Sequence, residues 1–180
     1  MTATTVPTVT VPRVTLPTPT TLSGPRTPYD TATGPAPGTR PHPAGTERDA
    51  WTELIDEVRE AGRYPTRREA ERITRIVLSA LGGHVIGDER VDLARALPEE
   101  AARVVAAQIP ATRPQTAPQF VESIAARIEG ATPATARWDV SSVLSVLPKL
   151  VGDDLVTRII AQLPPGYALL FGRADLAPAP

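Results

Sequence analysis

Histidine and carboxylate side chains are the residues of this sequence that could perform acid–base chemistry. His84 lies near Asp88 and Glu89, and a general base is often an imidazole supported by such a carboxylate. No serine nucleophile accompanies it, and the residue aligned with it in the internal repeat described below is Leu150. We therefore predict a surface or helix-capping histidine, and a metal-independent hydrolase using His84 and Asp88 is the weakest hypothesis.

Adjacent carboxylates occur at three places, Asp88-Glu89, Glu99-Glu100 and Asp153-Asp154. Each pair lies at the start of an expected helix, where the helix dipole stabilises negative charge by about 0.3–1 kcal/mol. A catalytic pair would instead need one acid in an apolar pocket and its partner at a defined separation. We predict that the protein has no catalytic residue and is not an enzyme.

Ligands for a metal or a cofactor are scarce, because the sequence has no cysteine and only two histidines, His42 and His84. The glycine-rich segment 81–88 resembles a phosphate-binding loop but lacks a preceding strand and a Lys-Ser/Thr ending. We predict instead that Gly82 or Gly83 caps a helix in the left-handed conformation and that Gly87 forms a turn. No metal or cofactor is expected.

Arginine side chains form the strongest local charge feature, in which Arg68, Arg72 and Arg75 share one face of an expected helix. Such a face could bind the phosphates of a nucleic acid. No aromatic residue is interleaved for base stacking, however, and Glu71 lies four residues before Arg75, where it can form an ion pair. A solvated and partly self-paired face is the preferred interpretation.

The elements that position these residues follow a long N-terminal tail. Residues 1–45 are rich in threonine and proline, and their only aromatic and acidic residues are Tyr29 and Asp30. They cannot form a core, so we predict a disordered arm, either a spacer or a docking motif for a partner's groove. No signal peptide or membrane span is expected, because charges and prolines interrupt every apolar stretch.

Apolar residues recur with helical period from residue 46 onward. The first expected helix buries Trp51, Leu54, Ile55 and Val58. The second begins after Thr66, which has a capping-box spacing to Glu69, and runs to Gly82-Gly83. A third helix extends from Gly87-Asp88 to Leu97, and Pro98 is the first residue of a fourth.

A repeat of 66 residues relates the two halves of this helical region. Residues 73–98 align with 139–164 without a gap and with eight identities in 26 positions. More weakly, Thr66 aligns with Thr132, and three apolar residues align as Leu54 with Phe120, Ile55 with Val121 and Val58 with Ile124. The sequence therefore predicts an all-α fold in which two tandem four-helix copies form one helical bundle.

The two copies differ in their third helix, where Glu89 and Arg90 correspond to Leu155 and Val156. This apolar helix is either the central element on which both copies pack or a surface for another protein chain. We favour the central element, because about 127 residues need a shared core. The expected organisation is a disordered tail (1–45), a helical domain (46–172, with copies at about 46–109 and 115–172) and a disordered C-terminus (173–180).

Turn and capping residues at 64–172 resemble a bacterial family known as domain of unknown function 2267. In the second copy they are Leu147-Pro148-Lys149, Gly152-Asp153-Asp154, Leu163-Pro164 and Tyr167-Ala168-Leu169-Leu170-Phe171. In the first they are Leu81-Gly82, Gly87-Asp88-Glu89 and Leu97-Pro98-Glu99-Glu100. The resemblance implies an all-helical bacterial protein without an established catalytic residue, cofactor or ligand. The many arginines beside a single lysine fit an actinobacterial genome.

Function is expected to be a non-enzymatic helical interaction or structural module of the bacterial cytoplasm. Its partner would be another protein of unknown identity, without membrane association. The alternative is weak nucleic-acid binding through Arg68, Arg72 and Arg75. The formal net charge of −1 argues against strong binding of nucleic acid.

Overall fold

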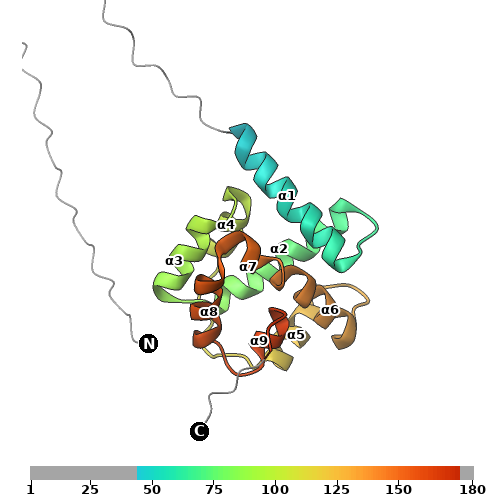
Figure 1. Ribbon diagram of the computed structural model, residues 1–180. Coiled ribbons are helices and arrows are strands. Elements are labelled where there is room, and N and C mark those ends of the chain that lie inside the picture. The colour runs from blue at the N-terminus through green and yellow to red at the C-terminus, as the bar shows by residue number, and fades with distance from the viewer. Residues whose placement is uncertain (1–43, 175–180) are drawn as a thin grey trace, which may run out of the picture. The chain divides into compact units, whose positions relative to one another are not determined.

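Helices account for all the regular secondary structure of the part of the chain that the structure describes, residues 44–174 of a computed structural model. Side chains are described from Glu47 onward. The helices are α1 (Ala44–Gly62), α2 (Arg67–His84), α3 (Gly87–Ala96), α4 (Glu99–Ala106), α5 (Ala117–Ala125), α6 (Pro133–Leu144), α7 (Leu147–Val151), α8 (Asp153–Gln162) and α9 (Tyr167–Leu170) (Figure 1). The predicted all-α fold is confirmed.

The chain ends of the helical region differ slightly from the predicted boundaries. Helix α1 begins at Ala44, while the rest of the predicted disordered tail lies outside the described residues. At the other end, Arg173 donates hydrogen bonds to Thr157 and Asp153 of α8. Residue 173 therefore belongs to the folded region, and the remaining part of the predicted C-terminal tail, from 175, lies outside the described residues.

Two threonines begin equivalent helices, as the repeat predicts. The Thr66 side chain accepts a hydrogen bond from the Glu69 N–H at 3.2 Å, and Thr132 does the same for Thr135. Thr132 and Thr135 complete a reciprocal capping box. For Thr66 only the first half of the predicted box is present among the described hydrogen bonds.

The repeat is visible in the bounds of the helices, because α3 and α8 begin and end 66 residues apart. Helix α2 corresponds to two helices, α6 and α7, which makes nine described helices rather than the predicted eight. Pro148 explains the break. It has no N–H to bond the Leu144 carbonyl, and its ring clashes with that carbonyl in a continuous helix.

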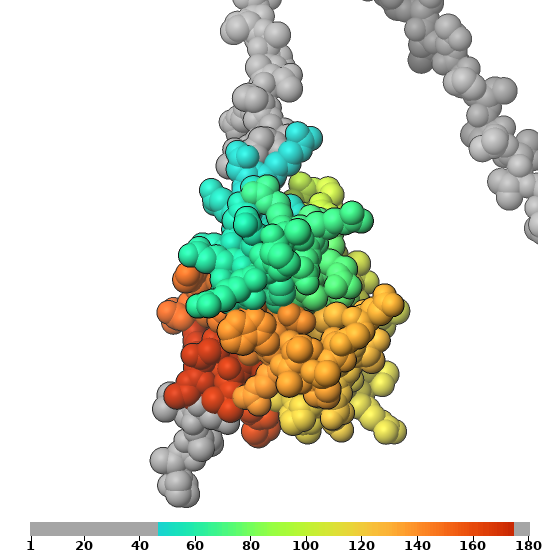
Figure 2. Space-filling model, turned by 90° about the vertical axis from the view of Figure 1, so that its right-hand side faces the viewer, coloured from blue at the N-terminus to red at the C-terminus, as the bar shows by residue number. Residues whose placement is uncertain are grey.

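Contacts between the copies follow a pseudo-twofold arrangement. Helix α1 packs on α6 while its counterpart α5 packs on α2, and α3 packs on its own counterpart α8. At that last contact Asp92 accepts a hydrogen bond from Arg158, the residue 66 positions later, at 2.7 Å. Figure 2 shows the blue-to-green first copy above the orange-to-red end of the second copy.

One continuous hydrophobic core lies between the copies. The aligned residues Leu54 and Phe120, and Val58 and Ile124, are fully buried in it. Leu155 and Val156 are buried there as well, on a helix that contacts both α3 and α7. Leu155 and Val156 are therefore not a partner surface, because their side chains are buried in the core. The prediction that their helix is the central element is wrong, since α8 packs mainly on α3 and α7, whereas α2 and α6 contact helices of both copies.

The glycines after Leu81 do not cap α2 in the left-handed conformation. Helix α2 continues through both of them to His84, and neither Gly82 nor Gly83 has a positive φ. Gly87, predicted as a turn residue, is the first residue of α3 and has a left-handed φ of +66°. Pro98 is the N-cap of α4 rather than its first residue, and Glu99 and Glu100 occupy the first turn.

Candidate functional site

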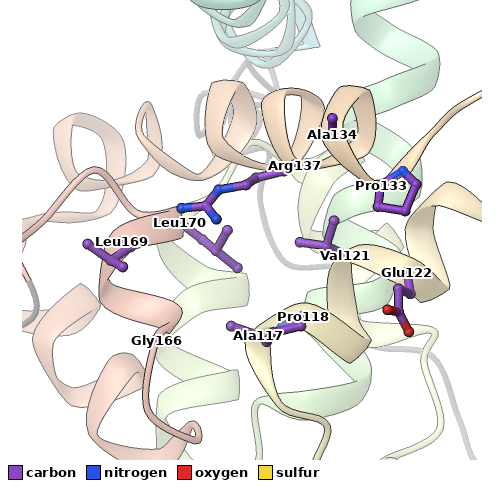
Figure 3. Close-up of a pocket in the computed structure, with 10 residues that line it drawn as sticks. All are labelled: Ala117, Pro118, Val121, Glu122, Pro133, Ala134, Arg137, Gly166, Leu169 and Leu170. Atoms are coloured by element: carbon purple, nitrogen blue, oxygen red, sulfur yellow. The ribbon is translucent and has the colours of Figure 1, made fainter.

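An apolar groove of about 400 Å³ lies between α5, α6 and α9, and its size is that of a typical ligand site. Prolines at the starts of two helices form part of its wall, Pro118 in α5 and Pro133 in α6. Because proline has no N–H, it does not add an anion-binding donor at either start. The remaining wall residues are small or apolar, except for two charged side chains (Figure 3).

The wall formed by α9 carries the most exposed large apolar side chain of the groove. Leu169 is 48% exposed, whereas its neighbour Leu170, the last residue of α9, is buried. Gly166 sets the direction of α9 with a φ of +97°, a left-handed conformation that favours glycine. A Cβ at this position would also lie 3.3 Å from the Cβ of Ala117 across the groove.

Glu122 on α5 and Arg137 on α6 are the charged residues of the groove. In Figure 3 the Arg137 side chain extends from α6 toward α9, while Glu122 lies on the other side of the groove. Neither forms an ion pair with another residue in the described part of the chain. The groove is therefore apolar and carries one charge of each sign.

The two copies differ at the wall position that Ala117 occupies. The residue that corresponds to Ala117 in the first copy is Trp51, which packs against the core. The guanidinium carbon of Arg75 lies 5.0 Å from the centre of the Trp51 ring, a cation–π contact. In the second copy a methyl group stands in place of the indole, and Ser141 stands in place of Arg75.

The predicted arginine face is only partly available to a ligand. Arg75 forms ion pairs with Glu71 and Glu100, each at 2.8 Å, which confirms the predicted pairing with Glu71. Arg68 and Arg72 are exposed and line a polar depression with Arg75. An aromatic ring, Trp51, does contact this face, but it lies under Arg75 and is half-buried.

His84 does not contact the carboxylates that would make it a general base. Its Nε2 lies 3.1 Å from the side-chain oxygen of Gln115, and its ring packs edge-on against Phe120 with centroids 5.6 Å apart. Burial lowers the pKa of His84 below its usual value, although the Gln115 hydrogen bond acts in the opposite direction. A neutral, partly buried histidine in the last turn of α2 is the result.

The paired carboxylates lie in the first turns of α3, α4 and α8, as predicted. Several of them form ion pairs across the surface, including Glu100 with Arg75, Glu89 with Arg158 and Asp153 with Arg173. Within residues 44–174 no three His, Cys, Asp or Glu side chains are grouped as metal ligands. These carboxylates connect helices rather than converge on a common site.

The groove was not predicted from the sequence, although one signal for it was present. Shifting the chain by 66 residues aligns Ala117 with Trp51, and the loss of so large a side chain marks a gap in the second copy. The contribution of α9 has no such signal, because Leu169 corresponds to Arg103 in a longer helix.

In the described residues, these features define an all-helical fold of two pseudo-symmetric copies with an apolar groove between α5, α6 and α9. The profile of a family described as uncharacterized conserved protein (DUF2267) matches residues 51–170. The chain belongs to this family, as the turn and capping residues indicated. No curated protein matches the chain. None of its described helices combines the length and hydrophobicity needed to cross a membrane.

Proposed function

We propose that this protein is a non-enzymatic interaction module that binds a short peptide segment of a protein partner in the groove between α5, α6 and α9. The observation that carries the proposal is the open apolar groove beside the half-exposed Leu169. The bound segment inserts an aromatic side chain, because the equivalent position of the first copy holds Trp51. A basic residue of the segment on one side of this aromatic ring would pair with Glu122, and an acidic residue on the other side would pair with Arg137.

The surroundings of the titratable residues support binding rather than catalysis. His84 interacts with an amide and an aromatic ring, and the carboxylate pairs are distributed over separate helix starts. The absence of cysteine supports a reducing compartment such as the bacterial cytoplasm.

Weak nucleic-acid binding through α2 is the second candidate function. Arg68 and Arg72 are exposed and adjacent on this helix, which favours contact with phosphates. Against it, Arg75 is already held by two glutamates, and the aromatic ring at this face is covered by Arg75 itself. Too few free charges and no stacking platform remain for tight binding.

Selection from a phage-displayed library of random dodecapeptides tests the proposed groove. The full-length chain is the bait. Enriched synthetic peptides should contain an aromatic residue, and Leu169→Glu should weaken their binding by about tenfold or more.

Val91→Glu is the matched control, because Val91 is 46% exposed on α3 and does not line the groove. It should leave the affinity of the enriched peptides unchanged. Enrichment of no peptide, or equal binding by the Leu169→Glu chain, would show that the groove is not a peptide site.

A further inference from the structure

Trp138 on α6 is the largest of the exposed apolar side chains in the described part of the chain, and 55% of it is exposed. It lies beside the groove along the helix. Ala134 and Arg137 line the groove (Figure 3), and Trp138 is four residues after the first and one residue after the second. Residues four apart share a helix face, and all three side chains are exposed. The exposed surface of α6 therefore runs from the groove to the Trp138 ring.

The indole of Trp138 is held in place by the turn that follows α1. Its Nε1 donates a hydrogen bond to the carbonyl oxygen of Gly62 at 3.1 Å. Two residues after Gly62, the Tyr64 hydroxyl donates to Oδ1 of Asp139 at 2.7 Å, so the turn is bonded to α6 at two adjacent residues. The ring therefore loses little conformational freedom when a ligand covers it. Because its N–H already has an acceptor, its exposed part offers an apolar surface.

Cations lie next to this ring in the chain. Arg137 precedes Trp138 on α6, and Arg63 follows Gly62, whose carbonyl bonds the indole. Both arginines are exposed, and neither forms an ion pair with another described residue. Asp139, the acid beside Trp138, is already hydrogen-bonded, and one glutamate and one arginine of α2 act on its pKa in opposite directions. This surface is complementary to an acidic segment that carries an apolar side chain.

We infer that Trp138 is a second anchor point for the segment bound in the groove, and that it contacts an aliphatic side chain beyond the acid that pairs with Arg137. A helix is about 10 Å across with its side chains, a distance that about three extended residues cover. The aliphatic residue therefore lies about three positions from the aromatic one, on the side of the acid. This inference rests on the proposed function and defines the partner as an acidic segment with two apolar anchors.

Fluorescence of Trp138 measures this contact directly. The chain has two tryptophans, so Trp51→Phe, a change outside the groove, leaves Trp138 as the single emitter. The probe is a synthetic dodecapeptide enriched by the selection described above, with phenylalanine as its aromatic residue. Saturating peptide should shift the emission to shorter wavelength and reduce quenching by acrylamide, because the ring becomes covered. Unchanged emission and quenching overturn the inference.

Substitutions separate an anchoring role from a structural one. Trp138→Ala should weaken binding of the enriched peptides about tenfold. Trp138→Phe also loses the hydrogen bond to Gly62 but keeps an aromatic face, so its affinity should stay within about threefold of the wild type. Equal losses in the two variants would assign the effect to that hydrogen bond and contradict an anchor. Ile109→Ala, at a position 87% exposed and outside the groove, is the matched control and should change nothing. Thermal unfolding like that of the wild type shows that each variant folds.

The peptide itself provides the reciprocal test. Serine in place of its aliphatic residue should weaken binding to the wild-type chain about tenfold and have little effect on the Trp138→Ala chain. Enriched peptides without an aliphatic residue near that position contradict the inference. An emission shift that grows with protein concentration in the absence of peptide would assign the Trp138 surface to a second copy of the chain and also overturn it.

The two proposals fail in different ways. Peptide binding that depends on Leu169 but not on Trp138 leaves the groove function standing and overturns only the second anchor. Binding that depends on Trp138 but not on Leu169 places the peptide outside the groove and overturns both proposals. Enrichment of no peptide overturns both as well.

Discussion

Gly82 and Gly83 are adjacent residues near the end of α2, yet their surroundings differ. A Cβ added to Gly82 would lie 2.7 Å from the carbonyl oxygen and 2.9 Å from the Cα of Val105, both backbone atoms of α4. A Cβ on Gly83 would have no neighbour closer than 3.6 Å. Gly82 therefore permits the close approach of α2 and α4, whereas Gly83 has no such role.

We predict that Gly82→Ala lowers the free energy of unfolding by about 1–3 kcal/mol, because backbone atoms of α4 must move. Gly83→Ala should raise it by about 0.5–1 kcal/mol, since alanine is the better helix former. Urea unfolding of the two variants beside the wild type measures both effects. Equal effects of the two changes would contradict a specific approach at Gly82.

At the scale of elements, the two copies use the same buried layer despite the break between α6 and α7. Leu81 near the end of α2 is fully buried, and its counterpart Leu147, the first residue of α7, is 1% exposed. The side chain before Pro148 enters the core despite the break in the helix. The repeat thus preserves positions in the core more strictly than helix continuity.

Leu81→Ala and Leu147→Ala should each lower the free energy of unfolding by about 2–5 kcal/mol, because each leaves a cavity in the shared core. The half-exposed Val91 provides the comparison, and Val91→Ala should cost about 0.5 kcal/mol or less. Chemical denaturation provides the three values. A loss below about 1 kcal/mol at either leucine would contradict the shared layer.

For the whole molecule, positive and negative charges are balanced, and part of them is paired locally. The formal net charge is −1, and arginines on four helices, as well as Arg173, are paired with carboxylates. Even the arginine-rich face of α2 commits Arg75 to Glu71 and Glu100. Such a surface gives little electrostatic attraction for a polyanion.

We predict no binding of duplex DNA or single-stranded RNA tighter than about micromolar at ~150 mM salt. Salt-titrated fluorescence anisotropy of the wild type and of the chain with Arg68, Arg72 and Arg75 changed to Ala provides the measurement. A second triple variant with Arg48, Arg95 and Arg113 changed to Ala is the matched control. Submicromolar binding removed only by the first triple change would favour nucleic-acid binding over the peptide groove.

Features that depend on residues close together in the chain could be predicted from the sequence alone. The helical period, the threonine caps, the acidic first turns and the 66-residue repeat each depend on residues close together in the chain or on a comparison of two segments. These signals predicted the all-α fold, the burial of Leu81 and Leu147 and the pairing of Glu71 with Arg75. The preference for a buried third helix in the second copy depended on the need of about 127 residues for a shared core, and Leu155 and Val156 are indeed buried.

Tertiary structure alone decided features that depend on which helices approach each other. Because glycine often ends helices, the sequence indicated a cap at Gly82 or Gly83, but the proximity of α4 gives Gly82 a different role. The spacing in the sequence placed His84 near Asp88, but in the structure its ring contacts Gln115 and Phe120, which belong to another segment. The groove is of this kind too, since Ala117, Arg137 and Leu169 come from three helices and only their packing creates the space between them.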